Sequence, residues 1–111
     1  MKFIVTRSNM KGTVTIPGSK SHTIRSIYIA SLADGHSVIR APLLSLDTES
    51  AIRVCRAFGA EIINSNYQLE VSGFRGQPST PENVIDVGNS GTTLRLGVST
   101  ASLCWRKSIY S

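Results

Sequence analysis

Apolar and polar residues alternate one by one through the first part of the chain. The stretches KFIVT (2–6) and GTVTI (12–16) both show this alternation, and RSNMK separates them. Such a pair predicts two strands joined as a β-hairpin. Pro17 and Gly18 then interrupt the second strand.

The spacing becomes helical from Ser19 to Ala33, where apolar residues recur every three to four positions: Ile24, Ile27, Tyr28 and Leu32. Gly35 lies where a helix end commonly turns left-handed. HSVIRAP (36–42) predicts a short strand that ends at Pro42.

Asp47 is a suitable N-cap for a second helix. Its apolar stripe consists of Ala51, Val54, Cys55 and Phe58, and Gly59 ends it.

Two further strands, EII (61–63) and YQLEV (67–71), are predicted around a polar turn at Asn64, Ser65 and Asn66. In the second strand Tyr67, Leu69 and Val71 are expected on one face, with Gln68 and Glu70 on the other. Residues 73–83 hold two glycines and two prolines and predict a loop. VIDV (84–87) predicts a buried strand, and a third helix is expected to begin near Thr92.

The predicted order is ββ, then αβαββ, then βα, which indicates an α/β or α+β fold with helices covering one face of a sheet. The 111 residues suffice for one small domain with a modest core.

Twelve Lys and Arg against seven Asp and Glu give a net charge of +5, which favours anionic partners. The basic residues are scattered, and the one adjacent pair is Arg106 and Lys107. With aromatic residues at only 6%, nucleic acid is not an expected partner. No apolar run reaches 18 residues and the N-terminus does not resemble a signal peptide, so neither a membrane partner nor export is expected, and the predicted location is the cytoplasm.

Cys55 and Cys104 both lie in apolar stretches of helical pattern, which predicts two reduced thiols in the core. His22 and His36 show no metal-ligand spacing, so no metal is expected.

A short pattern occurs twice, 70 residues apart. PGSKSHTIR (17–25) and GNSGTTLR (88–95) each have a glycine, four residues, then Thr, an aliphatic residue and Arg. Each follows a predicted strand and enters a predicted helix, which favours a duplicated structural unit.

A glycine loop that leads into a helix presents free backbone N–H groups and the positive end of the helix dipole to an anion. In the first copy, Lys20, Ser21 and Arg25 add an ammonium, a hydroxyl and a guanidinium, and Ser21 and Arg25 share a helix face. A solvated helix start capped by serine is the alternative. Neither a Walker P-loop nor a GxGxxG fingerprint is present.

In the second copy, the glycines of GNSGT (88–92) allow a ligand close to the backbone, and Arg95 either faces the same anion or pairs with Asp86. Asp47 and Glu49 fit a cap and a first-turn acid better than acid–base chemistry. His22 is either a general base or a solvent-facing side chain.

The segment PGSKSHTIRSIYIASLADG (17–35) resembles the N-terminus of the 5-enolpyruvylshikimate-3-phosphate (EPSP) synthase family, the 3-phosphoshikimate 1-carboxyvinyltransferases. Its PGSKSxxxR motif is matched in full. SLDTESAIRVCRAFGAEI (45–62) and VGNSGTTLRL (87–96) are similar to the next two family segments.

The resemblance implies transfer of the enolpyruvyl group of phosphoenolpyruvate to the 5-hydroxyl of shikimate 3-phosphate, without metal or organic cofactor. It implies that Lys20 is catalytic and touches both substrates, and that Ser21 and Arg25 hold shikimate 3-phosphate. Gly91 would let phosphoenolpyruvate lie against the backbone, in a loop shaped by Asn89 and Thr92. Glyphosate occupies the phosphoenolpyruvate place in this family, but Ser90 and Leu96 stand where many members have Ala and Pro, so sensitivity is open.

The family fold has two domains, each built from three βαβαββ units, known as the inverse α/β prism. By resemblance, residues 1–111 form one partial domain. Residues 17–87 are the first unit, residues 88–111 begin the second, and the hairpin 1–16 belongs to the other domain. The tail GVSTASLCWRKSIYS (97–111) departs from the family pattern at Trp105, Arg106 and Lys107.

Family members are several times longer, which leads to the expectation of a truncated fragment without turnover that binds anions weakly at most. The full enzyme is expected to be a monomer, whereas unpaired strand edges favour self-association of the fragment. Two other interpretations stay open: a fragment of the related UDP-N-acetylglucosamine enolpyruvyl transferase, and a non-catalytic anion-binding or structural module. The Lys20-Ser21 pair favours the EPSP synthase interpretation over the UDP-N-acetylglucosamine enzyme, whose segment carries Lys-Asn.

Overall fold

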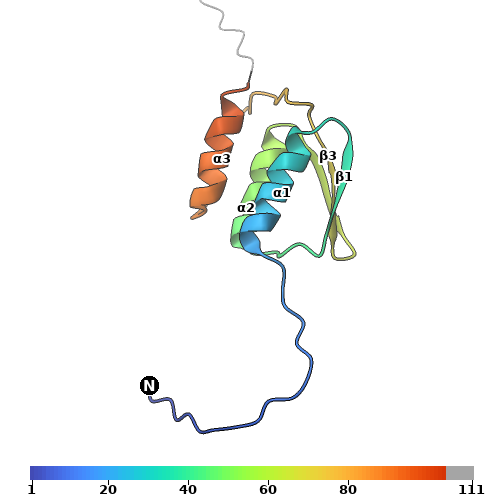
Figure 1. Cartoon of the computed structure of the whole chain (residues 1–111). Coiled ribbons are helices and arrows are strands. Elements are labelled where there is room, and N and C mark those ends of the chain that lie inside the picture. Colours follow the sequence, from blue (N-terminus) through green and yellow to red (C-terminus); the bar gives the residue numbers. More distant parts are fainter. Residues whose placement is uncertain (105–111) are drawn as a thin grey trace, which may run out of the picture.

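The structure is a computed structural model of the chain and describes residues 1–104. Its elements are, in order, α1 (Lys20–Leu32), β1 (His36–Arg40), α2 (Leu46–Ala57), β2 (Glu61–Ser65), β3 (Gln68–Ser72) and α3 (Gly91–Ala101). The strands form an antiparallel sheet in the order β1-β3-β2. The helices α1 and α2 cover one face of this sheet, and α3 packs on the far side of α1 and α2 (Figure 1). The predicted mixed α/β fold is confirmed, and the unusual residues Trp105, Arg106 and Lys107 lie outside the described part.

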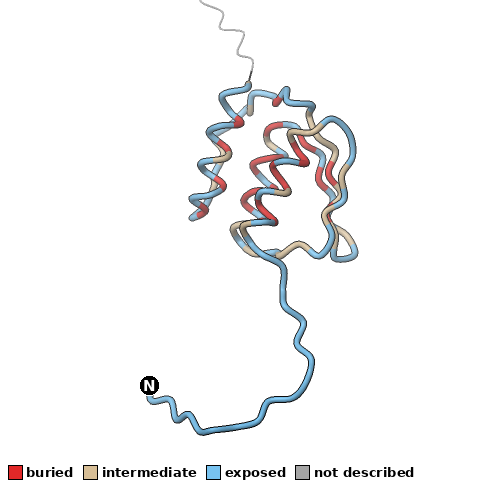
Figure 2. Tube along the Cα trace, in the orientation of Figure 1, coloured by how far each residue is buried: buried red, intermediate tan, exposed pale blue. Residues whose placement is uncertain are grey.

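The core lies between the sheet and the first two helices, where the buried positions face one another (Figure 2). Leu69 and Val71 on the central strand are fully buried, as are Ile24 and Ile27 on α1. The predicted stripe of α2 is buried in full: Ala51, Val54, Cys55 and Phe58. The side-chain periods of 2 in the strands and about 3.6 in the helices therefore identified most of these core positions.

The second helix begins two residues earlier than the sequence suggested. Ser45 is its N-cap, because its hydroxyl accepts from the backbone N–H of Thr48 and the Thr48 hydroxyl accepts from the backbone N–H of Ser45. This reciprocal pair is a capping box in which threonine takes the place of the usual glutamate. The prediction that Asp47 caps the helix was wrong, and Asp47 instead lies in the first turn.

The β2–β3 turn is also shifted from its predicted place. Asn66 and Tyr67 both have positive φ, 48° and 57°, and form the two central residues of the turn, while Ser65 still belongs to β2. Two positive φ values suit a hairpin turn whose twist matches that of the strands. Tyr67 is consequently 91% exposed, so the prediction that it shares the buried face of Leu69 was wrong.

The last carbonyl groups of α1 are satisfied by the loop that follows β3. The backbone N–H groups of residues 74, 75 and 76 donate to the carbonyls of Ser31, Ala33 and Leu32, respectively. Gly73 permits this approach, because a Cβ there would collide with the carbonyl oxygens of Ala30 and Ala33. The 73–76 loop thus closes the end of α1 from a distance, in a way that a local end signal such as Gly35 did not indicate.

The predicted N-terminal hairpin is absent, because residues 1–19 form neither a helix nor a strand. They run away from the domain as an extended segment (Figure 1), and apolar side chains such as Phe3, Val5 and Val14 are exposed. A two-stranded hairpin is marginally stable unless one of its faces is covered, and no described residue covers this one.

The predicted strand 84–87 is absent as well. Ile85 and Val87 are half-buried against the core cluster, whereas Val84 and Asp86 face outward. The alternation is therefore correct, but no neighbouring strand among the described residues pairs with this backbone, and the segment packs as an extended loop.

The prediction that Cys104 lies in a helix in the core was also wrong, since this residue follows the end of α3 and is half-buried. Cys55 is buried as expected, and both thiols are free.

Burial raises the pKa of the Cys55 thiol to about 11, an effect that the neighbouring Ser31 hydroxyl only partly offsets. The folded chain therefore keeps a proton that the unfolded chain loses near pH 9. We expect the free energy of unfolding to fall as pH rises from 9 towards 11, by up to about 3 kcal/mol. Urea unfolding followed across this range checks this prediction. Cys55→Ala should flatten the fall between pH 9 and 10, and an equal slope in both proteins would contradict it.

Candidate functional site

The three helices begin at the same end of the domain (Figure 1). Each start has a serine N-cap whose hydroxyl accepts from a backbone N–H three residues later: Ser19, Ser45 and Ser90. The remaining free N–H groups and the positive ends of three parallel helix dipoles therefore lie on one side of the molecule. Such a surface attracts anions.

Asp47 connects these helix starts. Its carboxylate Oδ2 lies 2.7 Å from the Nζ of Lys20, the first residue of α1. Its backbone carbonyl accepts from the hydroxyl of Thr93, at 3.5 Å, in the first turn of α3. Thr93 Oγ1 in turn accepts from the hydroxyl of the N-cap Ser90, at 2.7 Å. The two loops of the sequence repeat are thereby tied to the same turn of α2.

The repeat also has a structural meaning at its threonines. Thr23 and Thr93 are aligned by the repeat, and both are buried. The hydroxyl of Thr23 donates to the Ser19 carbonyl at 2.8 Å and accepts from the backbone N–H of Leu43 at 3.0 Å. Each aligned threonine thus attaches its own helix start to the segment 43–47 that leads into α2.

The three predicted residues of the first loop lie in the first two turns of α1. Lys20 is half-exposed and paired with Asp47, Ser21 is half-buried, and Arg25 is exposed. Arg25 makes no ion pair with any residue between 1 and 104. Its charge is therefore available to a ligand, while the charge of Lys20 is shared with a carboxylate.

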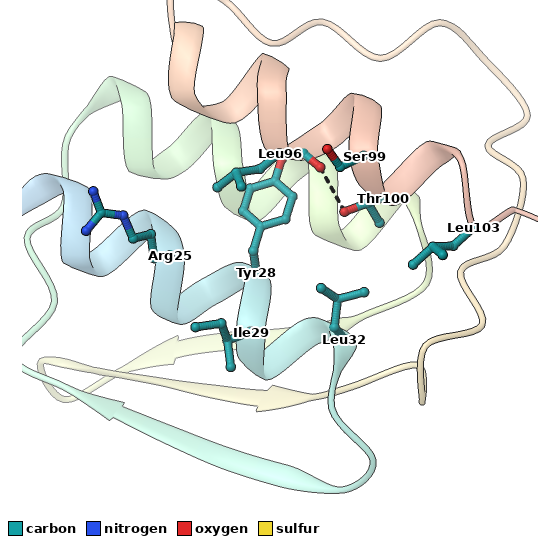
Figure 3. Close-up of a pocket in the computed structure, with 8 residues that line it drawn as sticks. All are labelled: Arg25, Tyr28, Ile29, Leu32, Leu96, Ser99, Thr100 and Leu103. Atoms are coloured by element: carbon teal, nitrogen blue, oxygen red, sulfur yellow. Dashed lines mark hydrogen bonds between the residues drawn. The ribbon is translucent and has the colours of Figure 1, made fainter.

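Arg25 also borders an apolar groove of about 280 Å³ between α1 and α3 (Figure 3). The groove is formed mainly by Ile29, Leu32, Leu96 and Leu103, and neither Lys20 nor Ser21 reaches it. An apolar lining does not suit a polyanion. The groove lies beside the helix starts, and Arg25 at its edge is the one predicted anion-binding residue among its lining residues.

The second loop is held by its own hydrogen bonds. Asp86 Oδ1 accepts from the backbone N–H of Gly88 at 2.8 Å, which makes an Asx turn. Gly88 has a φ of +57°, and a Cβ there would lie 3.2 Å from the Ser50 hydroxyl. Of the two alternatives for Arg95, pairing with Asp86 does not occur in the described part of the chain. Asn89 and Arg95 are exposed.

Gly91 has no close neighbour, unlike Gly73 and Gly88. It is the first residue of α3, and a Cβ added to it would meet no atom within 4 Å. Its φ is not positive, so neither backbone strain nor internal packing calls for glycine here. The space above Gly91 and its neighbour Thr92 is open to a ligand.

Residues 1–104 contain no group of three His, Cys, Asp or Glu side chains placed to hold a metal ion. Within the same range, every helix is too short or too polar to cross a membrane. His22 is exposed and makes no side-chain hydrogen bond in this part of the chain.

Comparison with known proteins identifies the family of the chain. The family model for EPSP synthase, or 3-phosphoshikimate 1-carboxyvinyltransferase, matches residues 4–109. The chain belongs to the EPSP synthase family.

Named relatives support the assignment to this EPSP synthase family. The 3-phosphoshikimate 1-carboxyvinyltransferase of Ruminiclostridium cellulolyticum is 58% identical over 99 residues, which cover 89% of this chain and 24% of the relative. The same-named protein of Acetivibrio thermocellus is 57% identical over 103 residues, covering 93% of this chain and 24% of the relative. A solved EPSP synthase from Acinetobacter baumannii superposes with a TM-score of 0.74 at 27% identity, over 80% of this chain and 21% of that one. The chain thus spans about a quarter of the length of the curated relatives it matches.

Sequence reasoning did not anticipate the Lys20–Asp47 pair. The two residues are 27 positions apart, so no helical spacing connects them, and the only signal was an acidic residue in the first turn of a predicted helix. That signal also fits a favourable interaction with the helix dipole.

The ion pair predicts a specific response to Asp47→Asn. The pair is partly exposed, at 51% for Lys20 and 28% for Asp47, so its loss should lower the free energy of unfolding by less than about 1 kcal/mol. The Lys20 side chain should become as mobile as that of Lys11, which is exposed in the N-terminal segment. Carbon-13 relaxation at the two Cε atoms measures this. Equal mobility of Lys20 and Lys11 in the unsubstituted chain would contradict the ion pair.

Proposed function

We propose that this chain supplies part of the substrate site of an enzyme that transfers the enolpyruvyl group of phosphoenolpyruvate to the 5-hydroxyl of shikimate 3-phosphate. The observation that carries the proposal is the common placement of three helix starts around Asp47. Both substrates are polyanions. Membership of the EPSP synthase family is the reason to propose these two among the anions that such a surface could bind. The substrates are accordingly its proposed partners, with no nucleic acid or membrane.

In this proposal the first turns of α1 bind shikimate 3-phosphate. Ser21 donates its hydroxyl and Arg25 its planar guanidinium to the anionic groups of this substrate. Lys20 is the catalytic residue, placed between the two substrates. Its partner Asp47 keeps the ammonium at the helix start until a substrate anion arrives.

The start of α3 receives phosphoenolpyruvate. The open space at Gly91 allows the substrate to lie against backbone N–H groups, where a side chain would keep it away. Asn89 and Thr92 form the walls of this loop. Glyphosate would occupy the same place.

The chemistry requires cations more than it requires a cofactor. Protonation of the methylene carbon of phosphoenolpyruvate and attack of the 5-hydroxyl on the adjacent carbon form a tetrahedral intermediate. Loss of inorganic phosphate and of a proton from the methyl group then gives the product. Fixed positive groups such as Lys20 and the helix starts stabilise the charge of the intermediate. No metal or organic cofactor takes part in this proposal.

The remaining groups of the site would come from the part of the enzyme that corresponds to the other three quarters of the relatives. We assign the apolar residues of segment 1–16 to the second domain of such an enzyme, in agreement with their exposure here. Residues 17–87 then form the first repeat unit and residues 88–111 begin the next. The proposed location is the cytoplasm.

Titration with shikimate 3-phosphate tests the proposed site. In nitrogen-15 NMR spectra we expect weak binding, with shifts confined to the backbone amides of residues 20–25 and to neighbouring helix starts. Lys20→Met should abolish these shifts, and Lys11→Met, which removes an equal charge from the exposed N-terminal segment, should leave them unchanged. An equal loss of the shifts in both variants would show that binding depends on net charge alone and would contradict the proposed site.

Given both substrates, the 111-residue chain should release no phosphate, and clear turnover would contradict the proposal that the site is incomplete.

Gly91→Ala tests the second half of the site. Because an added Cβ meets open space and alanine is a good helix former, the free energy of unfolding should stay the same or rise by up to about 1 kcal/mol. Shifts caused by phosphoenolpyruvate at residues 89–92 should nevertheless be lost. Retention of these shifts would remove Gly91 from the site.

A further inference from the structure

Tyr28 joins the two helices that carry the halves of the proposed site. Its ring rises from α1 towards α3, beside the apolar groove (Figure 3). Its hydroxyl donates to the backbone carbonyl of Thr93 at 2.9 Å, and this hydrogen bond is buried. The two residues are 65 positions apart, so the bond fixes tertiary structure.

The opposite helix leaves space for this contact at Gly97. A Cβ at Gly97 would lie 3.4 Å from the Tyr28 hydroxyl oxygen and 3.5 Å from Cγ1 of Val54. One methyl group would fill that space, and any larger side chain would push α3 away from both neighbours. The approach of Tyr28 therefore limits position 97 to glycine or alanine, although glycine is the less favourable of the two inside a helix.

Thr93 is held from two sides. Its carbonyl accepts from Tyr28 of α1, and its hydroxyl donates to the Asp47 carbonyl of α2. Since Gly91 precedes it by two residues in the same helical turn, these bonds fix the direction in which the start of α3 points.

The bond persists over the whole physiological pH range. Burial, and secondarily the nearby Cys55 thiol, raise the pKa of Tyr28 well above its ordinary value of 10.0. The hydroxyl is therefore a protonated donor at neutral pH.

We propose that Tyr28 is a positioning residue that sets the Gly91–Thr93 turn relative to the Lys20–Arg25 turn, and so couples the two halves of the anion site. Tyr28 touches no substrate itself. Its effect on ligand binding rests on the proposed function, whereas its effect on the start of α3 does not.

Tyr28→Phe removes the hydroxyl and keeps the ring, and Tyr67→Phe makes the same change at an exposed turn. Without ligand, we expect backbone amide hydrogen exchange at Leu94 and Gly97 to become roughly fivefold faster in Tyr28→Phe, as for the loss of one net hydrogen bond. Exchange at Val54 in α2 should not change. Tyr67→Phe should match the unsubstituted chain throughout. Equal exchange rates at Leu94 and Gly97 in the two variants would overturn the proposal.

Shikimate 3-phosphate then tests the coupling. In the unsubstituted chain, its binding at residues 20–25 should also shift the amides of Gly91 and Thr92. In Tyr28→Phe most of the shift at Gly91 and Thr92 should be lost while that at residues 20–25 remains, and full retention would overturn the coupling. If the unsubstituted chain shows no shifts at all, the proposed function fails, and the exchange experiment alone decides the role of Tyr28.

A direct observation avoids dependence on the folding of any variant. In the unsubstituted chain the Tyr28 hydroxyl proton should exchange slowly enough to be detected, with nuclear Overhauser effects to residues of the first turn of α3. A hydroxyl proton in fast exchange with water would contradict the buried bond.

Discussion

The carbonyl and carboxylate of Asp47 hold the starts of three helices together. The carboxylate pairs with Lys20 in α1, and the carbonyl accepts from Thr93 in α3. The ion pair alone is exposed and contributes little to stability. Its importance is geometric, because it places an ammonium among the free N–H groups of parallel helices, where an anion also binds most favourably.

The duplicated sequence pattern supports this arrangement through its threonines more than through its glycines. Thr23 and Thr93 both attach a helix start to the segment 43–47 at the beginning of α2, so the two copies of the pattern contact the same short segment. The glycines have separate roles: Gly88 closes on Ser50, whereas Gly91 leaves an open surface. The proposed reaction joins two phosphorylated substrates, and a repeat of this kind would let one fold element supply a surface for each of them.

Local patterns predicted those parts of the fold that depend on local physics. The spacing of Ile24 and Ile27, and the stripe through Val54 and Cys55, identified the buried faces of α1 and α2. The strand predictions were wrong where a strand needs a partner. The alternation in 2–6, 12–16 and 84–87 describes a side-chain pattern and does not reveal a neighbouring strand. The predicted N-cap of α2 was wrong for a similar reason. Asp47 and Ser45 are both residue types that cap well, and the Ser45–Thr48 capping box decides between them.

For the site, the residues and loops that the sequence indicated, and their roles in binding, stay predictions. The sequence did not indicate what holds the loops together. The Lys20–Asp47 pair spans 27 positions and the Tyr28–Thr93 bond spans 65, and both depend on how the helices pack. The space that Gly97 leaves for Tyr28 is of the same kind, since a single glycine inside a helical pattern has many explanations until its neighbour is known.

The contact between Thr93 and Asp47 is the most direct test of this account, because it joins the second loop to the residue that pairs with Lys20 of the first loop. A nuclear Overhauser spectrum of the 111-residue chain in solution should contain cross-peaks between the Thr93 side chain and the backbone protons of Asp47 and Thr48. A well-formed α1–α2 core without these cross-peaks, with the start of α3 turned away, would contradict the account.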